Sequence, residues 1–159
     1  MAFRKLKIAS EITEFDSIEE LPESIQKMIY LSKEVSQTAY APYSNFKVGS
    51  SVLLENGEII TGSNQENSAY PSGLCAERVA LFSANSKYPN VPVKAVVVYG
   101  SKGGEKAVDP VAPCGACRQV ISEYEDLAGM KIDLYMAGES RVILAKGIES
   151  LLPMRFRLL

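Results

Sequence analysis

Histidine is absent from this chain of 159 residues, and that absence removes whole classes of chemistry. Without an imidazole there is no Ser/His/Asp or Cys/His nucleophilic catalysis and no histidine general base near neutral pH. Histidine metal ligands are excluded in the same way. Any chemistry that the chain performs must therefore use other side chains.

The sequence also lacks long apolar runs and an excess of positive charge. A membrane-spanning helix needs ~20 apolar residues, whereas the longest strand-like apolar run is only residues 95–99. Lys and Arg total 17 against 19 Asp and Glu, which gives a net charge of -2. This balance argues against a nucleic-acid partner held by general electrostatics. We expect neither a membrane nor a nucleic acid as partner.

The N-terminus carries positive charge but has no apolar block of the kind that follows it in a signal peptide. Glu11, Glu14 and Asp16 stand where that block would lie. The sequence therefore predicts a cytoplasmic protein.

With 47% hydrophobic residues, the chain is long enough to bury the core of one globular domain. No internal repeat or long Pro/Gly/Ser linker divides it. We predict one catalytic domain over residues 21–159, preceded by a leader over residues 1–20 to which the sequence assigns no role.

Apolar spacing and turn residues predict helices and strands in the order α-β-β-α-β-α-β-β. The signal for the first hairpin is Asn56-Gly57 between two apolar runs. This order favours an α/β fold in which helices cover a mixed sheet. The expected helices are 21–41, 75–86 and 114–124, and the expected strands lie in a hairpin at 46–61 and at 93–99, 132–136 and 142–145.

The three cysteines, Cys75, Cys114 and Cys117, are an odd number in a chain predicted to be cytoplasmic, so they make a poor disulfide framework. Buried structural thiols are the plain interpretation. However, each site falls where a helix is expected to begin, and helix N-termini favour the thiolate that binds metals. Cys114 and Cys117 would share a helix face and, with Cys75, could bind one Zn²⁺. Three ligands leave a fourth position open, as in catalytic zinc sites.

Glu77 lies two residues after Cys75, in the same predicted helical turn. Taken alone, it would be an acidic residue that stabilises a helix N-terminus. Beside three convergent thiolates, its carboxylate can instead shuttle protons without binding the metal. Arg78 could donate to the sulfurs and offset their negative charge, although it could also be an ordinary exposed arginine.

Two motifs carry a resemblance to a known family. Cys75-Ala-Glu-Arg78 followed by Pro113-Cys-Gly-Ala-Cys-Arg-Gln119 resembles the three-cysteine form of the zinc-dependent cytidine deaminases. Residues 40–49, 62–67 and 151–156 are similar to stretches of the small homotetrameric members. Together these matches cover roughly residues 21–156.

The resemblance implies a three-layer α-β-α sandwich with a mixed five-stranded sheet, and a homotetramer with composite active sites. It also implies hydrolytic deamination of cytidine and 2′-deoxycytidine in pyrimidine salvage, with release of ammonia. In that mechanism a zinc-bound hydroxide attacks C4 of the base. Glu77 first protonates N3 and then the leaving amine.

The resemblance further implies which residues contact the nucleoside. Asn64 and Glu66 would hold the ribose hydroxyls, and the backbone N–H of Ala76 would meet the pyrimidine O2. Phe46 would line the base pocket, and Phe156 would reach the ligand of a neighbouring subunit. Without the resemblance, these would be ordinary loop residues and core or surface aromatic residues. After Phe156, the sequence departs from the Gly-Pro that the family pattern leads us to expect.

Three other functions are compatible with a zinc site of this kind. A polynucleotide deaminase needs a basic surface that the net charge of -2 does not suggest. A deaminase of a nucleoside antibiotic such as blasticidin uses a similar scaffold, but Glu66 favours recognition of a ribose. A non-catalytic, zinc-stabilised interaction module would have no use for Glu77 beside an incomplete ligand set.

Overall fold

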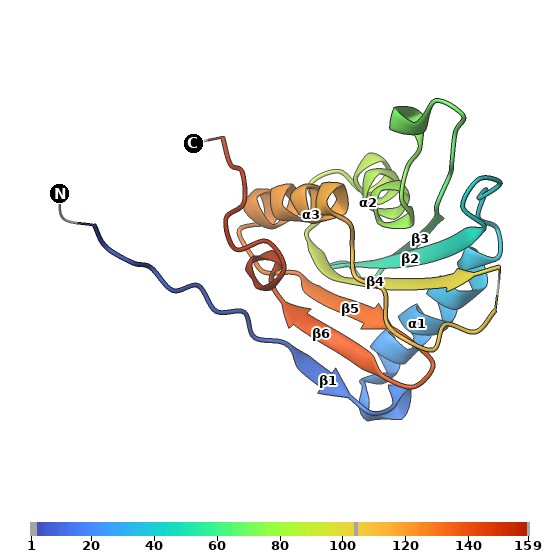
Figure 1. Cartoon of the computed structure of the whole chain (residues 1–159), viewed down its shortest axis with the longest axis horizontal. Helices are drawn as coiled ribbons and strands as arrows, with labels where there is room; N and C mark the ends of the chain where they lie inside the picture. The colour runs from blue at the N-terminus through green and yellow to red at the C-terminus, as the bar shows by residue number, and fades with distance from the viewer. Residues whose placement is uncertain (1–2, 104, 159) are drawn as a thin grey trace.

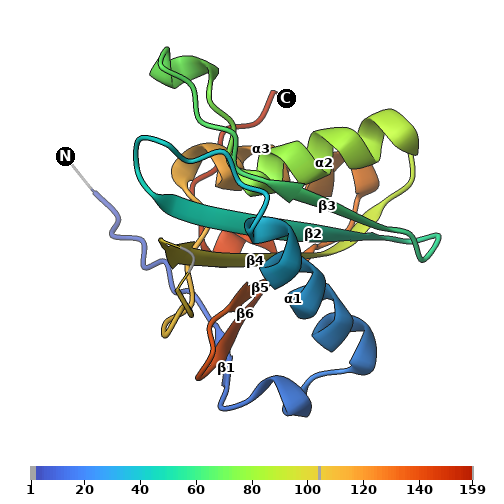
Figure 2. The ribbon, with the colours of Figure 1, turned by 90° about the vertical axis from the view of Figure 1, so that its right-hand side faces the viewer.

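A computed structural model describes residues 3–103 and 105–158 of the chain. A sheet lies between α1 on one face and the pair α2 and α3 on the other, as Figures 1 and 2 show. None of the helices in this described part is long and apolar enough to cross a membrane. The elements are β1 (Thr13–Phe15), η1 (Ile18–Glu20), α1 (Glu23–Ser36), β2 (Phe46–Leu54), β3 (Ile59–Ser63), η2 (Tyr70–Ser72), α2 (Ala76–Lys87), β4 (Val93–Lys102), α3 (Gly115–Ala128), β5 (Asp133–Ala137), β6 (Val142–Lys146) and η3 (Ile148–Ser150).

The sheet is mixed, with strand order β1-β6-β5-β4-β2-β3. Only the β4–β5 pair is parallel among the pairs described. The predicted α/β architecture and element order are confirmed from α1 to β6. The predicted number of five strands is wrong, because β1 adds a sixth by pairing with β6, with Thr13 opposite Leu144. A strand of three residues is too short to show the alternation by which the other strands were predicted.

Helix α1 ends at Ser36, several residues before the predicted end near Tyr40. The N–H groups of Thr38 and Ala39 donate to carbonyls three residues earlier, as in a tightening last turn. The chain then leaves the helix, and the N–H of Tyr40 donates to the carbonyl of Asn64 at 3.0 Å. This contact ties the end of α1 to the loop after β3.

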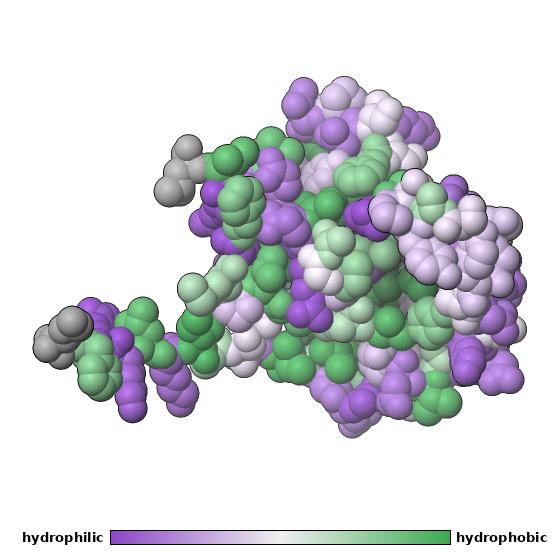
Figure 3. Space-filling model, turned by 45° about the horizontal axis from the view of Figure 1, so that its top comes forward, coloured by the Kyte–Doolittle hydropathy of each residue, from purple (hydrophilic) through white to green (hydrophobic). Residues whose placement is uncertain are grey.

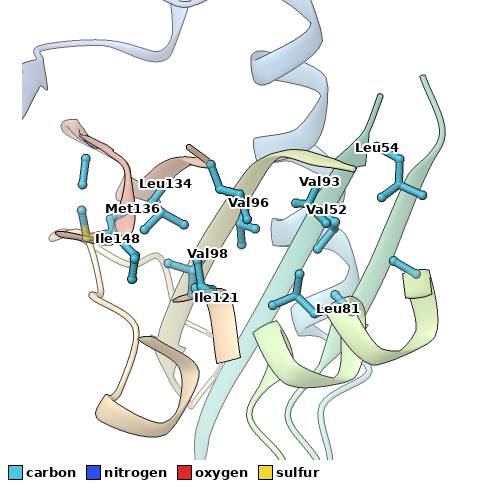
Figure 4. Close-up of a cluster of buried hydrophobic side chains, with 14 residues drawn as sticks. Val52, Leu54, Leu81, Val93, Val96, Val98, Ile121, Leu134, Met136 and Ile148 are labelled. Atoms are coloured by element: carbon cyan, nitrogen blue, oxygen red, sulfur yellow. The ribbon is translucent and has the colours of Figure 1, made fainter. Parts of the chain in front are cut away.

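The core has two halves, one on each face of the sheet. Leu81 of α2 and Ile121 of α3 pack against Val52 and Val96, as Figure 4 shows. On the other face, Met28 of α1 belongs to a second buried cluster. Successive residues of β4 contribute to opposite clusters. This burial on both faces agrees with the continuous β-branched run in the sequence.

Gly62 allows α2 to approach β3 closely. A Cβ atom at this position would lie 2.6 Å from the backbone nitrogen of Ala80 and 2.9 Å from the carbonyl oxygen of Ala76. Both distances are below van der Waals contact, so a side chain here would push α2 away. Because Gly62 has no side chain, the first half of α2 can pack directly on β3.

Residues 3–12 project from the body before β1 begins, as Figures 1 and 3 show. The chain joins the sheet at β1, and Ile18 is buried in the core on the α1 face. The division into a leader and a catalytic domain at residue 21 stays a prediction.

Candidate active site

The three cysteines come together where α2 and α3 begin. Cys75 and Cys114 are the residues that precede the first turns of these helices, and Cys117 lies in the first turn of α3. The Sγ atoms of Cys75 and Cys114 are 3.6 Å apart, and those of Cys114 and Cys117 are 3.5 Å apart. All three sulfurs lie within 4.8 Å of one another.

These distances fit a zinc ion. Four ligands arranged tetrahedrally at the usual Zn–S length of about 2.3 Å would place two sulfurs about 3.8 Å apart. The three thiols therefore need only a small adjustment to bind one ion. Since three protein ligands leave one tetrahedral position for water or substrate, the donor set is that of a catalytic site.

The surroundings of the cluster favour a thiolate. Hydrogen bonding from Cys117 is the main factor that lowers the pKa of Cys75 to about 5, and Arg78 adds to it. Conversely, the hydrogen bond to Cys75 and burial raise the pKa of Cys117. Cys75 and Cys114 also stand at the N-termini of α2 and α3, where the helix dipoles favour a thiolate. Zinc binding would displace the remaining thiol protons.

Arg78 contacts the cluster as the sequence predicted it could. Its Nη2 donates to the Sγ of Cys75 at 3.8 Å and to the carbonyl oxygen of Gly73 at 3.3 Å. Its Nε is buried and has no hydrogen-bond partner among the described residues. The guanidinium therefore offsets negative charge on the sulfurs while its side chain fixes the loop before α2.

Glu77 is buried in the first turn of α2, with only 3% of its surface exposed. Burial is the main cause that raises its pKa, and the charge on Cys75 raises it further. Cys117 lies close enough to influence the same carboxyl. The structure thus places Glu77 beside the cysteine cluster, where a carboxylate is costly to bury unless it has a partner.

A cavity of about 500 Å³ opens next to Cys75. Residues of the loop before β2 and of the loop after β3 form most of its lining. The loop after β3, which carries η2, projects from the body of the protein, as Figure 2 shows. This volume suits a small organic ligand. The lining residues are Tyr43, Ser44, Asn64, Gln65, Glu66, Asn67, Tyr70, Gly73, Leu74, Cys75 and Arg78.

Asn64 in this cavity uses both ends of its side-chain amide on the backbone of β2. Its Oδ1 accepts from the N–H of Val48 at 2.8 Å, and its Nδ2 donates to the carbonyl of Phe46 at 2.9 Å. Each end keeps one further hydrogen-bonding position, because an amide oxygen has two lone pairs and the NH₂ group has two hydrogens. Asn64 therefore fixes the start of β2 and can still contact a ligand.

Glu66 holds the turn that precedes β2. Its carboxylate accepts hydrogen bonds from the N–H groups of Tyr43 and Ser44 and from the Ser44 hydroxyl. The Ser44 hydroxyl also accepts from the N–H of Phe46 at 3.0 Å. These contacts, the Ser44 hydroxyl first, lower the pKa of Glu66 below its ordinary value. The carboxylate stays ionised and keeps room for another donor.

The remaining predicted contact residues lie in different places. Phe46 begins β2 with its ring over Gly100, outside the lining of the cavity. Ala76 is fully buried in the first turn of α2, where N–H groups lack partners within the helix. Phe156 is not among the residues that line the cavity; its carbonyl contacts Gln119 of α3, and 68% of its surface is exposed.

Two features of the site had no assigned role in the sequence. The rings of Tyr43 and Tyr70 meet edge to face at 6.0 Å beside the cavity. Arg118 donates to the carbonyls of Pro113 at 2.8 Å and Leu151 at 2.7 Å, which ties the loop before Cys114 to the C-terminal segment. Tyr43 and Arg118 stand within the stretches that carry the family resemblance, but nothing in the sequence indicated Tyr70.

Comparisons with known proteins agree with this geometry. Residues 22–128 match the sequence model of the cytidine and deoxycytidylate deaminase zinc-binding region. The cytidine deaminase of Sporosarcina psychrophila is 47% identical over 100 residues, which are 63% of this chain and 69% of that protein. The crystal structure of the cytidine deaminase from Burkholderia pseudomallei superposes with a TM-score of 0.69 at 36% identity, over 82% of this chain and 97% of that one. A more distant relative, the blasticidin-S deaminase of Bacillus cereus, is 30% identical over 112 residues, 69% of this chain and 76% of that protein.

The α/β sandwich and the three-thiol cluster define a zinc-dependent hydrolase. The chain belongs to the cytidine and deoxycytidylate deaminase family, and the relatives named above place it among the cytidine deaminases. The predicted family, fold class and zinc cofactor are therefore confirmed.

Proposed function

We propose that this chain deaminates cytidine and 2′-deoxycytidine to uridine and 2′-deoxyuridine, with consumption of one water and release of ammonia. The observation that carries the proposal is the meeting of three thiols beside one buried carboxylate, Glu77, next to a cavity of nucleoside size. The relatives that are named cytidine deaminases support the same substrate. A role in pyrimidine salvage and a cytoplasmic location stay predictions.

Cys75, Cys114 and Cys117 would hold the zinc ion. When bound, zinc supplies Lewis acidity, which makes water a nucleophile at neutral pH. Arg78 contributes positive charge at the Cys75 sulfur, since the donation from its Nη2 draws electron density from that ligand. The N-termini of α2 and α3 act in the same direction.

Glu77 would move the protons of the reaction. Its carboxylate takes the proton that the attacking water gives up and delivers it to N3 of the base. It then delivers the second water proton to the 4-amino group, which leaves as ammonia, while the water oxygen remains on C4. One carboxylate thus serves first as base and then as acid. Its burial keeps bulk water from competing for these protons.

Asn64 and Glu66 would orient the nucleoside through the ribose. Both line the cavity, and both retain at least one hydrogen-bonding position beyond their contacts within the chain. The backbone N–H of Ala76, in the first turn of α2, would bind O2 of the pyrimidine, and Phe46 would pack against the base. Such contacts turn binding energy into orientation of C4 over the metal site.

We further propose a homotetramer in which Phe156 of one subunit reaches the nucleoside of another. This proposal is supported by the exposure of Phe156 on its own chain and by its absence from the lining of that chain's cavity. A stacked aromatic ring would be worth about 1 kcal/mol.

Zinc analysis of the purified protein, combined with an absorbance assay, tests the function. Cytidine, deoxycytidine, adenosine and blasticidin are offered in parallel at equal concentration. We expect one zinc per chain and turnover of the two cytidine nucleosides. Turnover of blasticidin alone would instead place the chain with the antibiotic deaminases. Zinc without turnover of any substrate would favour an interaction module.

A further inference from the structure

The C-terminal segment alternates between apolar side chains that face outward and arginines that face α3. Met154 and Phe156 are exposed by 84% and 68%, and Leu158 by 92%. Arg155 and Arg157, between them, both pair with carboxylates of α3. This period of two is that of an extended chain lying along a surface. Figure 1 shows the segment running beside α3 to the C-terminus.

Arg155 is the more buried of the two arginines. Its Nη1 donates to the Oε2 of Glu125 at 3.1 Å and to the hydroxyl of Ser122 at 3.1 Å, and its Nη2 donates to the Oδ1 of Asp126 at 3.0 Å. Only 16% of the Arg155 side chain and 4% of the Glu125 side chain are exposed. Solvent therefore screens this pair far less than it screens a surface ion pair.

Glu125 is itself fixed to the body of the protein. Its Oε1 accepts from the backbone N–H of Ile132 at 3.0 Å and from that of Ile148 at 2.9 Å. The carboxylate thus joins α3 to the start of β5 and to η3 while its other oxygen binds Arg155. An arginine held by such a group has little freedom to move.

The contacts also bracket Phe156 on both sides. Arg157 binds Asp126 in bidentate fashion, with Nε to Oδ2 at 3.0 Å and Nη2 to Oδ1 at 2.8 Å. The Nε2 of Gln119 donates to the carbonyl oxygen of Phe156 at 3.0 Å. The backbone before, at and after Phe156 is therefore fixed to α3, while the ring itself faces outward.

We propose that Arg155 and Arg157 are positioning residues for the shared active site: they hold Phe156 in the orientation in which a second copy of this chain receives it. The inference rests on the proposed function, since it takes Phe156 as a ligand contact. Within one chain, these contacts fix the segment but leave Met154, Phe156 and Leu158 exposed, so the anchoring buries no apolar surface there. Between copies, it removes the entropy cost of ordering the segment on docking.

A double-mutant cycle on the full-length, zinc-loaded protein tests this inference. The variants are Arg157→Ala, Phe156→Ala and the double mutant, with KM and kcat for cytidine, zinc content and thermal unfolding measured for each. Arg157 is the better target because its contacts lie at the surface. Arg141→Ala is the matched control, since Arg141 is a similarly exposed arginine that pairs with carboxylates, Glu14 of β1 and Asp109 of the loop before α3, and not with the C-terminal segment.

We expect Arg157→Ala to raise KM by about two- to fivefold with kcat and zinc content unchanged. In the Phe156→Ala background, the same change should have no further effect on KM, because the residue that Arg157 positions is already gone. Arg157→Lys keeps the positive charge but loses the bidentate contact with Asp126, so its KM should lie between those of the parent and Arg157→Ala. Arg141→Ala should leave KM unchanged.

Three outcomes would overturn the inference. Arg157→Ala that leaves KM unchanged while Phe156→Ala raises it would show that the ring needs no positioning. An equal rise in KM in both backgrounds would show an effect unrelated to Phe156. A Phe156→Ala enzyme with unaltered KM would remove the shared contact itself and leave zinc-dependent turnover as a separate result.

Arg155→Ala, with folding checked by thermal unfolding, should raise KM more than Arg157→Ala does.

Discussion

Two sides of the candidate site use their polar groups differently: the three-cysteine cluster with Glu77, here called the metal side, and Asn64 with Glu66, which we propose to bind the ribose and here call the sugar side. On the metal side, the sulfurs of Cys75, Cys114 and Cys117 contact mainly one another, and Glu77 is buried beside them. On the sugar side, Asn64 and Glu66 are already bonded to the backbone of the turn before β2 and of β2 itself. The difference implies that the metal side gains stability from its ligand, whereas the sugar side supports the fold before any ligand binds.

The first test of this comparison is replacement of a metal ligand, for which we expect the largest effect. Cys117→Ser should release zinc and abolish deamination, because no other set of three soft ligands lies together in the described residues. It should also remove the rise in melting temperature that zinc gives the parent protein, since a ligand stabilises only the state that binds it. Metal analysis and thermal unfolding with and without zinc measure both effects.

The same measurements on Cys75→Ser and Cys114→Ser complete the test. Each should lose metal in the same way. A full zinc complement in all three variants would contradict the proposed ligand set.

Replacement of the buried carboxylate should give the second largest effect. Glu77→Gln keeps the shape of the side chain but removes the proton carrier, so zinc and fold should be retained while kcat falls by roughly 10²–10⁴. The assay is cytidine turnover together with zinc analysis. Glu123→Gln, the same change at an exposed position of α3, should leave kcat unaltered. Activity of Glu77→Gln within a few-fold of the parent would remove Glu77 from the mechanism.

On the sugar side, we expect Asn64→Asp, which barely alters the shape of the side chain, to lower the free energy of unfolding. Asn64→Asp keeps an acceptor for the N–H of Val48 but replaces the donor to the Phe46 carbonyl with an oxygen. An unsatisfied, repelled carbonyl costs about 1–3 kcal/mol, even without substrate. Denaturant unfolding measures this difference.

Asn67→Asp is the matched control for that change. The Oδ1 of Asn67 accepts from the N–H of Ala69 at 2.8 Å, and a carboxylate can do the same. If Asn64→Asp were as stable as Asn67→Asp, the claim that the sugar side supports the fold would fail.

The two sides also differ in what the sequence could reveal. The spacing of Cys114 and Cys117, and the helix expected after each cysteine site, predicted the start of α2, the start of α3 and the convergence of the thiols, because local periodicity fixes helix starts. The element order from α1 to β6 followed from the same kind of local pattern. On the metal side, the structure therefore added mainly the distances between the sulfurs.

The contacts of Asn64 and Glu66 could not be predicted in this way. They join residues 16 to 23 positions apart, and all but the contact with the Ser44 hydroxyl go to backbone groups, which leave no trace in residue type. Strand β1 was missed for a related reason, since its three residues gain their role only from pairing with β6. The pairing of Arg155 and Arg157 with α3 likewise depends on how the C-terminal segment lies across that helix.

The smallest expected effect concerns the charge of Glu66. Its pKa is lowered in the folded protein, first by the Ser44 hydroxyl and then by the N–H of Tyr43. A carboxyl whose pKa is lower in the folded state contributes stability above its unfolded pKa, and that stability is lost as the pH falls through the folded pKa. The melting temperature of the parent should therefore exceed that of Glu66→Gln at pH 7, and the gap should narrow below the ordinary pKa of 4.5.

Because both proteins carry the same zinc ligands, loss of metal in acid affects them alike. In a Ser44→Ala background, the gap between the glutamate and glutamine forms should be smaller and less dependent on pH, since the main cause of the lowered pKa is gone. A gap that widens as the pH falls would mean that Glu66 is held in its protonated form, and would contradict the turn-holding role assigned to its carboxylate.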